Sequence, residues 1–498
     1  MGVLQITLRF LLFGLLLLVV LSNANAQSSK RDSYRSGFNA VYPAQQVVED
    51  IDFFIKALEA AHPDLYRYIK KPQMDLLVDR LKGQAGQINC RQLYNQLNHI
   101  ASAVGCGHLI LSYPKEQEKY LLKYAYFLPL HIELHDSAVI VMRSFIDSVK
   151  VTNAIVRSIN GMPMDSMLLR VHQYLTRDGY ITSANNWLLE NGWFNEFYIR
   201  FWPDSNTYTY ELEMLTDSGW VNEKLTLQGY DFQKMKIQRY KREKPTPKLH
   251  LKFDNDTQTA ILTLESFDPK EIAKGKQNFE KFIKHAFWQI VQKQPEQLII
   301  DLRGNAGGNS FYPEAIIAFL SNEPFRLYRN MQIRYNSLAS GKPIVSITGK
   351  RAYKKMQKHS MLAKNGNREL KQFTERYVTN YPYSYKGTVY VMVNGGTYSA
   401  ASELACYLKQ HVEAIVVGSE TGGTCDPVTA GMYGLATLPN TGIAINIPLI
   451  SFEKDIKQPR ILGHGLMPDI PQHLRSTDSI PDPELEHLLE VIEAQGAE

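Results

Sequence analysis

The stretch that most constrains how this chain can fold is residues 391–403, VMVNGGTYSAASE. Three apolar residues predict the end of a buried strand, Asn-Gly-Gly forces a tight turn, and the apolar positions after Ser399 recur at helical spacing. A serine on such a strand-to-helix turn has its hydroxyl directed outward, and the helix N-terminus beneath it favours developing negative charge. Serine is also a favoured helix cap. Ser399 is therefore either an activated nucleophile or a simple N-cap.

The alternation of strand and helix continues on both sides of this stretch. Short apolar runs predict strands at residues 259–264, 297–301, 388–393, 414–417 and 443–447, whereas helical spacing marks residues 271–291, 312–320 and 400–409. Continuous apolar strands that alternate with helices favour a parallel or mixed α/β sheet. We therefore expect an α/β core at residues 246–475.

A second glycine-rich turn, DLRGNAGG at residues 301–308, follows one of these strands. Turns at the carboxyl ends of strands are where such sheets place ligands. This one lacks the Lys-Ser/Thr of a phosphate loop and the spacing of a dinucleotide loop, which disfavours a nucleotide. Its exposed amides suit an oxyanion instead.

The amino end has the pattern of a signal peptide. Arg9 supplies positive charge, residues 10–21 form an apolar run with Gly14 as its one break, and Ala24-Asn25-Ala26 is an A-x-A cleavage site. The apolar run is too short to span a bilayer comfortably. We expect an exported protein, periplasmic or extracellular, without stable membrane insertion; a retained amino-terminal anchor is the alternative.

Between the signal peptide and the core, the chain first favours helices and then short strands. Helices are expected at residues 47–61, 74–81 and 90–104, the last one ending at Gly105-Cys106-Gly107-His108, and a strand-and-helix module follows from about residue 124. The Lys-rich residues 241–248 read as a linker, and residues 325–386 as a lid or a solvated insertion in the core. The expected division is 1–26, 27–123, 124–245, 246–475 and 476–498, the last being an acidic, helical tail.

Composition excludes several classes of function. The net charge of +5 is small for 498 residues and gives no case for nucleic acid. Cysteine is too sparse for a disulfide scaffold, and no cysteine–histidine spacing indicates a metal site. We expect neither a metal nor an organic cofactor.

Four motifs together resemble the C-terminal-processing (tail-specific) serine peptidase family. They are LIIDLRGNAGG at residues 298–308, NGGTYSAASE at 394–403, GSETGG at 418–423 and GLMPDI at 465–470. The resemblance spans roughly residues 249–472 and implies a multidomain α/β fold with a crotonase-like catalytic core and a PDZ-like α+β module. HPDLYRY at 62–68 and GCGH at 105–108 resemble the tricorn-core-like branch of secreted bacterial members.

The resemblance makes Ser399 the nucleophile and raises the question of its base, since a serine hydroxyl needs a group to take its proton. The Ser/Lys branch of the family has a lysine 25 residues after the nucleophile, but here that position is Thr424, which cannot act as a base. The tricorn-like branch takes a histidine from upstream, and His108 stands in the matching glycine-flanked motif. His108 is the preferred base, with His464 as its main rival.

An acidic residue should orient the imidazole. The position that would align with the branch's glutamate is Leu462, so the candidates are Glu453, Asp455 and Glu420, of which we select Glu453. Glu403, one helical turn past Ser399, is interpreted as packing or capping.

By the same resemblance, the oxyanion hole combines the amide of Ala400 with that of Gly307 or Gly308. The segment FLPLH at residues 127–131 lacks the glycine-containing carboxylate loop of PDZ domains that bind carboxyl termini. Cys106 and Cys425 flank the His108 and GSETGG motifs, so they are either a disulfide pair or independent thiols.

We therefore expect an exported serine endopeptidase that cleaves unfolded or extended polypeptide through an acyl-enzyme on Ser399, with His108 as its base. The competing hypothesis is a non-catalytic binding protein that kept the fold, because an altered base position is also what a decayed enzyme would show.

Overall fold

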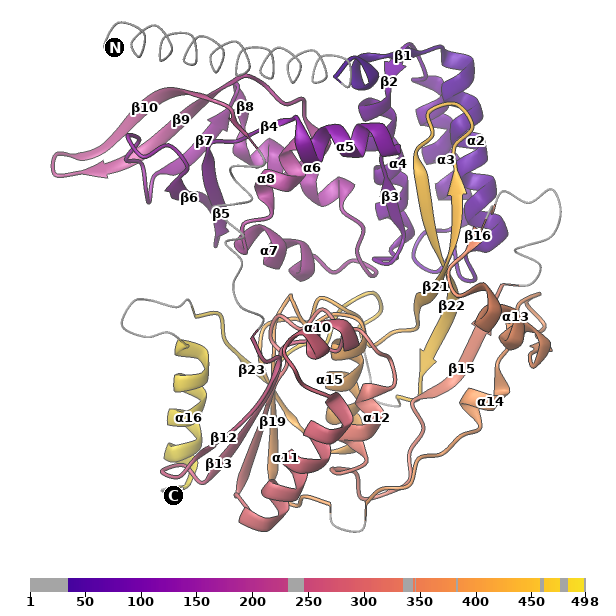
Figure 1. Ribbon diagram of the computed structural model, residues 1–498, viewed down its shortest axis with the longest axis vertical. Coiled ribbons are helices and arrows are strands. Elements are labelled where there is room, and N and C mark those ends of the chain that lie inside the picture. Colours follow the sequence, from indigo (N-terminus) through magenta and orange to yellow (C-terminus); the bar gives the residue numbers. More distant parts are fainter. Residues whose placement is uncertain are drawn as a thin grey trace, which may run out of the picture.

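The computed structural model describes residues 35–231, 246–334, 344, 346–381, 384–456, 461–474 and 482–496. The expected signal peptide and most of the expected linker at 241–248 lie outside the described residues. Within the described ranges, no helix combines the length and the apolar character needed to cross a bilayer. The elements form two halves stacked along the long axis of the molecule (Figure 1).

The first half begins with a group of helices. Its elements are β1 (Val41–Tyr42), α2 (Ala44–Ala61), α3 (Lys71–Gly83), β2 (Ile88–Asn89), α4 (Cys90–Val104), β3 (Ile110–Ser112) and α5 (Lys115–Lys123). The three expected helices are present. The side chain of Asn89 caps α4 by accepting the Gln92 amide at 2.9 Å, and α4 ends where Gly105 turns left-handed at φ 68°. This turn sets the start of the loop that carries His108.

The middle module is an antiparallel sheet with three helices. The strands are β5 (Leu130–His135), β6 (Ala138–Ser144), β7 (Ile155–Ile159), β8 (Met162–Pro163), β9 (Thr207–Thr216) and β10 (Gly219–Gln228), in the order β10-β9-β7-β6-β5 with β8 on β7. The helices are α6 (Met164–Tyr174), α7 (Ser183–Glu190) and α8 (Phe194–Phe201), and β4 (Tyr126–Phe127) pairs with β11 (Tyr230–Asp231). Helices α7 and α8 were not anticipated from the sequence.

The second half is built on a six-stranded mixed sheet. Its strands are β12 (Leu249–Asp254), β13 (Thr259–Leu264), β14 (Gln297–Asp301), β19 (Thr388–Val393), β20 (Ile415–Gly418) and β23 (Ile470–Pro471), in that order, and they are parallel except for β12. Its helices are α10 (Pro269–Lys274), α11 (Phe279–Lys293), α12 (Tyr312–Ile317), α15 (Ala400–His411) and α16 (Pro483–Gly496). The sequence predicted β13, β14 and β19 to the residue.

The prediction of a single helical stretch at residues 271–291 is wrong. The chain leaves the helical conformation after Lys274, Lys276 adopts φ 59°, and the side chain of Asn278 caps a new helix by accepting the Lys281 amide. An interior N-cap therefore divides the segment into α10 and α11.

Both faces of this sheet are covered. Leu298 and Ile300 of β14 join the main apolar cluster, whereas Ile299 faces the other way and packs with Leu488 and Ile492 of α16. Figure 1 shows α16 beside the strands, opposite α11, α12 and α15. The tail thus completes the layer that makes these strands apolar on both sides.

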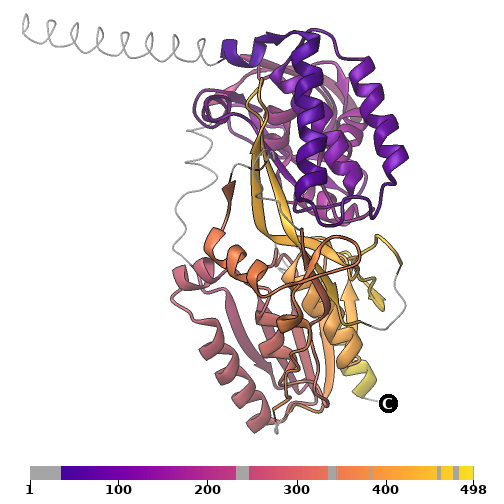
Figure 2. The same cartoon turned by 90° about the vertical axis from the view of Figure 1, so that its right-hand side faces the viewer.

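A third sheet joins the two halves. Its strands are β15 (Tyr328–Ile333), β16 (Ser346–Ile347), β17 (Met361–Leu362), β18 (Arg368–Glu369), β21 (Val428–Thr437) and β22 (Ala444–Lys454), with β3 added on β22. The expected insertion at 325–386 contributes β15–β18 together with helices α13 (Lys350–Lys358) and α14 (Lys371–Thr374). It is therefore part of the folded core and not only a solvated surface insertion. The β21–β22 hairpin runs from the lower half into the helical group (Figures 1 and 2).

Candidate active site

Two glycine-rich turns lie together at the carboxyl ends of β14 and β19. Asn394 Oδ1 accepts the amides of Gly304 and Gly396, both at 2.9 Å. Thr397 Oγ1 donates to the Leu302 carbonyl at 2.9 Å. These side-chain bonds replace the strand pairing that ends here, and they fix the two turns as one unit.

Ser399 stands at the end of this unit in a conformation that non-glycine residues seldom adopt. Its backbone has φ 53° and ψ −126°, and its side chain makes no capping hydrogen bond to α15. The hydroxyl instead lies 3.3 Å from Nε2 of His108. The helix-cap interpretation of Ser399 is therefore wrong.

His108 reaches Ser399 because a strand of the helical group joins the third sheet. Two residues after His108, β3 begins and pairs with β22, with Ile110 opposite Asn446 and Ser112 opposite Ala444. The two side chains are 291 positions apart in sequence, and each belongs to a different half of the molecule. The β21–β22 hairpin, to which β3 is paired, therefore holds His108 beside Ser399.

The second ring nitrogen of His108 faces Tyr398 rather than a carboxylate. Tyr398 Oη lies 3.4 Å from Nδ1, and the two rings stack with centroids 5.2 Å apart. Burial lowers the pKa of the His108 imidazole below its ordinary value, although the negative charge of Asp178 raises it in part and Lys454 lowers it. The lowered pKa keeps the ring neutral, as a base must be.

Asp178, in the loop after α6, comes from the middle module. Its Oδ1 accepts the Gly107 amide at 2.9 Å, and the residue is 3% exposed. The same loop donates the Gly179 amide to the Gly105 carbonyl at 3.0 Å. Sequence reasoning missed Asp178, because an Asp-Gly turn after a helix carries no catalytic signal of its own.

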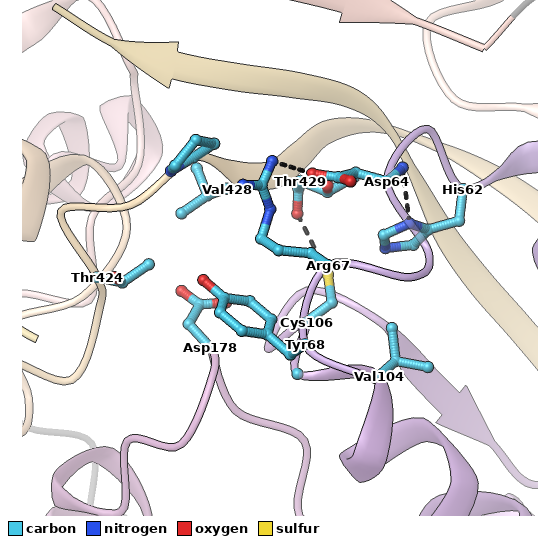
Figure 3. A pocket seen from close by; sticks show the side chains of 12 residues that line it. His62, Asp64, Arg67, Tyr68, Val104, Cys106, Asp178, Thr424, Val428 and Thr429 are labelled. Atoms are coloured by element: carbon cyan, nitrogen blue, oxygen red, sulfur yellow. Dashed lines mark hydrogen bonds and ion pairs between the residues drawn. The ribbon is translucent and has the colours of Figure 1, made fainter. Parts of the chain in front are cut away.

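Asp178 also lines a small cavity of about 10 Å³ together with His62, Arg67, Tyr68 and Cys106 (Figure 3). This volume holds about one water molecule. The cavity therefore has no room for a substrate.

The expected oxyanion donors differ in availability. The Gly307 amide already donates to Asn305 Oδ1 at 2.8 Å. Within the described residues, no hydrogen bond involves the amide of Ala400 or of Gly308. A β-carbon on Gly307 would come within 2.9 Å of the Ala400 nitrogen, so the two turns are in contact. Ala400 and Gly308 are thus the better-placed pair.

The structure does not bring Glu453 to the site. On β22 the side chains alternate, and Glu453 falls on the half-exposed face between buried Phe452 and Lys454, where Arg329 binds its carboxylate at 2.6 Å. The other candidates are also engaged, Asp455 by Arg326 and Glu420 by His464. Across the described parts of the chain, none of the three carboxylates hydrogen-bonds to His108 or Ser399.

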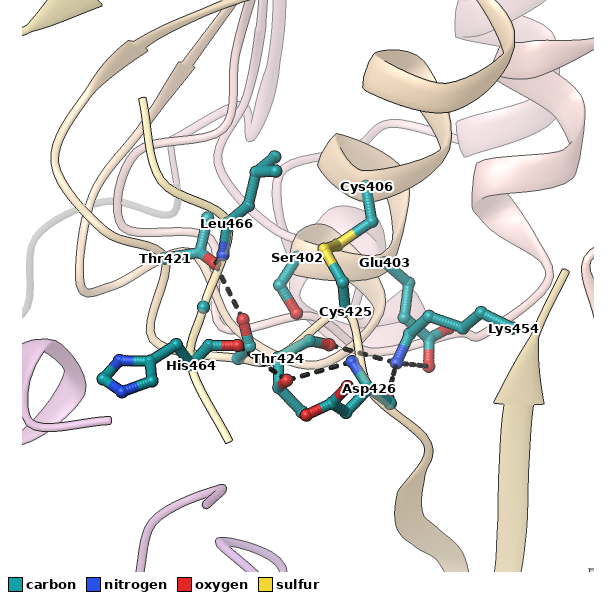
Figure 4. The surroundings of a disulfide bond; sticks show 12 residues. Ser402, Glu403, Cys406, Thr421, Thr424, Cys425, Asp426, Lys454, His464 and Leu466 are labelled. Carbon is teal, nitrogen blue, oxygen red and sulfur yellow. Dashed lines mark hydrogen bonds and ion pairs between the residues drawn. A yellow bond between two sulfur atoms is a disulfide. The ribbon is translucent and has the colours of Figure 1, made fainter. Parts of the chain in front are cut away.

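The rival base is also placed elsewhere. His464 Nδ1 faces Glu420 Oε1 at 3.3 Å, its ring is 36% exposed, and it points away from the neighbouring disulfide (Figure 4). Thr424, at the position of the lysine of the Ser/Lys branch, donates its hydroxyl to the His464 carbonyl at 2.7 Å. Neither side chain hydrogen-bonds to Ser399 in the described residues.

Beneath the nucleophile, two buried polar side chains face each other, Glu403 of α15 and Lys454 of β22. Glu403 accepts from Tyr328 Oη at 2.9 Å, and its other oxygen lies 3.9 Å from Nζ of Lys454. Lys454 also donates to the carbonyls of Thr424 and Asp426, at 3.1 and 2.7 Å. Glu403 is thus a packing residue as expected, and Lys454 is a partner that sequence reasoning missed.

Of the two alternatives for Cys106 and Cys425, a pair or independent thiols, the pair is wrong and only Cys106 is a free thiol. Cys425 is disulfide-bonded to Cys406 of α15, with their α-carbons 5.8 Å apart (Figure 4), whereas Cys106 and Cys90 are free and buried. Sequence spacing did not indicate Cys406 as the partner of Cys425. Cys406 lies two helical turns beyond Ser399, and Cys425 comes beside it only because the chain returns through β20.

Part of the chain matches a known peptidase family, and the fold is similar to that of solved structures. Residues 258–472 match peptidase family S41. The structure is similar to that of mature CPAF, at 12% identity and a TM-score of 0.56 over 90% of this chain and 96% of that one. A CPAF mutant gives a TM-score of 0.59 at 12% identity over the same shares of the two chains.

CPAF in complex with lactacystin gives a TM-score of 0.57 at 13% identity, over 91% of this chain and 98% of the other. At these identities the likeness shows a shared fold, while the match of the four-motif region carries the family. Residues 258–472 are a peptidase family S41 domain, the domain of C-terminal-processing serine peptidases, and the chain is a serine-type peptidase.

Proposed function

We propose that this protein hydrolyses polypeptides through an acyl-enzyme on Ser399, with His108 as general base and then general acid. The observation that carries the proposal is the 3.3 Å separation of Ser399 Oγ from His108 Nε2, made across the two halves of the molecule. Hydrogen bonds of this length are common in ligand-free sites and shorten when substrate binds. A decayed enzyme has no reason to keep this alignment.

In the proposed reaction, Nε2 takes the proton of Ser399 while Oγ forms a bond to the scissile carbonyl carbon. The amides of Ala400 and Gly308 donate to the oxyanion. His108 then returns the proton to the leaving amine, and a water molecule repeats the sequence to release the acid. The strained backbone of Ser399 keeps its hydroxyl clear of α15 throughout.

We also propose a domain organisation, a substrate class and export for this protein. The mixed sheet is a crotonase-like core, the middle module is PDZ-like, and the divisions at about residues 124, 246 and 476 separate the domains. Substrates are unfolded or extended chains. The disulfide between Cys406 and Cys425 supports export, because such bonds persist in oxidising compartments. Mass analysis of the mature amino terminus tests export, with residue 27 expected.

The test of the activity is digestion of a denatured, carboxymethylated protein such as casein, with the products identified by mass spectrometry. We expect cleavage at internal bonds, and a loss of at least ~10³-fold in Ser399→Ala and in His108→Ala. His464→Ala is the matched control and should digest at the wild-type rate. Absence of cleavage by wild type, or loss in His464→Ala with retention in His108→Ala, would contradict the proposal.

A further inference from the structure

The imidazole of His108 needs a group that fixes which of its nitrogens carries the proton. For the ring to accept from Ser399 at Nε2, its proton must reside on Nδ1. The neighbour of Nδ1 is the hydroxyl of Tyr398, at 3.4 Å. A hydroxyl can either donate or accept, so by itself it does not select the productive tautomer.

The nearby carboxylate of Asp178 removes this ambiguity. Tyr398 Oη and Asp178 Oδ1 both lie against the α-carbon of Gly107, where a β-carbon would collide with the first and stand 3.3 Å from the second. Asp178 Oδ1 already accepts the Gly107 amide, whereas the buried Oδ2 has no hydrogen-bond partner in the described part of the chain. An ionised carboxylate accepts only, so a hydroxyl beside it turns its proton toward it.

Resting on the proposed function, we infer that Tyr398 and Asp178 form a positioning relay, Asp178···Tyr398···His108, in place of the single carboxylate that usually orients a catalytic histidine. Asp178 holds the hydroxyl proton of Tyr398, and the Tyr398 oxygen then accepts from Nδ1–H of His108. Nε2 is left as an acceptor facing Ser399. The two residues come from the loop after α6 and from the turn before α15.

No proton is transferred between Asp178, Tyr398 and Nδ1 of His108. When Nε2 takes the proton of Ser399, the ring becomes positive, its Nδ1–H bond to Tyr398 strengthens, and the Asp178 charge lies one hydroxyl away. The proton leaves Nε2 for the amine of the departing peptide. Burial raises the pKa of Tyr398 well above its ordinary value, and the charge of Asp178 raises it further, so Tyr398 keeps its proton.

The charged groups that face His108 come from several elements. Asp178 of the α6 loop raises the pKa of the imidazole, and Lys454 of β22 lowers it. Tyr398, of the turn before α15, is neutral, and burial keeps the thiol of Cys106, on the loop of His108 itself, in its neutral form by raising its pKa. Removing the Asp178 charge therefore lowers the pKa of His108.

Asp178 also supports the loop of His108 through Gly107, so a loss of activity alone does not separate positioning from folding. Two variants divide these roles. Tyr398→Phe removes the hydroxyl and leaves the Asp178–Gly107 bond. Asp178→Asn keeps an oxygen for Gly107, but its amide can donate to Tyr398 and so turns the hydroxyl proton toward Nδ1, which favours the wrong tautomer.

The experiment measures kcat and KM against pH for peptide hydrolysis by the two single variants and their double. We expect each single variant to lose ~10²-fold or more in kcat with little change in KM. The double variant should be within about threefold of the worse single, because residues that act as a unit are not additive. The acid limb should move to lower pH in Asp178→Asn and stay in place in Tyr398→Phe.

Tyr407→Phe is the matched control. It removes a buried hydroxyl of α15, the helix that follows Tyr398, and this hydroxyl donates to the Leu327 carbonyl and not to His108. It should retain wild-type kcat. Wild-type kcat in either single variant, losses that multiply in the double, or an unmoved acid limb in Asp178→Asn would overturn the relay. In that case Ser399→Ala would still be inactive, whereas an active Ser399→Ala would overturn the proposed function itself.

Discussion

At the scale of single residues, the buried imidazoles show how environment decides protonation. His108 sits beside Ser399 with its pKa lowered by burial, and it remains neutral at pH values where a free histidine is charged. His62, at the end of α2, is buried more completely: its Nδ1 accepts the Asp64 amide at 3.2 Å, and its Nε2 has no partner among the described residues. Burial lowers the pKa of His62 from 6.5 to about 3.

The His62 shift predicts acid sensitivity. In the folded protein the ring stays neutral down to about pH 3, while the unfolded chain binds a proton near pH 6.5. Stability that is present above pH 6.5 is therefore lost as the pH falls. His62→Asn, which can still accept the Asp64 amide, should reduce the loss between pH 7 and pH 4.5 by about 2–3 kcal/mol.

Urea unfolding at the two pH values measures this difference. His359→Asn is the control, because that side chain is exposed at the end of α13 and its replacement should leave the acid loss unchanged. Equal acid losses in wild type and His62→Asn would show that His62 is not the buried neutral group described here.

Among the elements, the β21–β22 hairpin matters most to the site, because β3 and hence His108 depend on it. Its tip is held by Asp50 of α2, a fully buried carboxylate. Asp50 accepts the amides of Asn440 and Thr441, both at 2.9 Å, and the Thr441 hydroxyl at 2.6 Å. Charge-assisted bonds to several donors offset the cost of burying this group.

Asp50→Ala should lower the free energy of unfolding by about 2–4 kcal/mol, since it leaves several buried donors without an acceptor. It should also lower kcat by loosening the placement of His108. The matched control is Glu49→Ala, because the Glu49 carboxylate makes only exposed hydrogen bonds among the described residues, to the side-chain amides of Asn440 at 3.2 Å and Gln45 at 3.1 Å. Thermal unfolding and peptide hydrolysis report the two effects. A wild-type melting temperature in Asp50→Ala would contradict this role.

The disulfide joins α15 to the loop just after the GSETGG segment, and its cysteines are 19 positions apart in sequence. A closed loop of this length predicts a stabilisation of about 3 kcal/mol. Reduction should lower the free energy of unfolding of wild type by this amount, and with it the unfolding midpoint, and should have no effect on the double variant Cys406→Ala/Cys425→Ala. A wild-type midpoint that is insensitive to reductant, with thiols shown to be free by alkylation, would refute the contribution of this bond.

Across the whole molecule, the sequence predicted the strands and motifs that depend on a local pattern of residues. β13, β14 and β19 were placed to the residue because each is an apolar run that ends at a turn. Helices α7 and α8 were missed because they are eight residues each, too short for a helical period to stand out. The serine and histidine were found through motifs whose glycines fix the backbone around them.

Contacts that depend on tertiary structure were not predictable in this way. The carboxylate of Asp178 and the amine of Lys454 reach the site only after three sheets assemble, and no spacing in sequence marks either one. Glu453 was selected by its distance from a motif, but strand alternation turned it to the surface. The bond of Cys425 to Cys406 was likewise outside both alternatives considered for Cys425, because only the folded chain brings the two together.

The central claim, that Ser399 is a nucleophile activated by His108, is tested most directly by intact-mass analysis after treatment with a fluorophosphonate at neutral pH. The account predicts one adduct per chain on Ser399 in wild type, none in Ser399→Ala, and labelling slowed by ~10³-fold or more in His108→Ala. Equal labelling rates in wild type and His108→Ala, or an adduct that persists in Ser399→Ala, would contradict it.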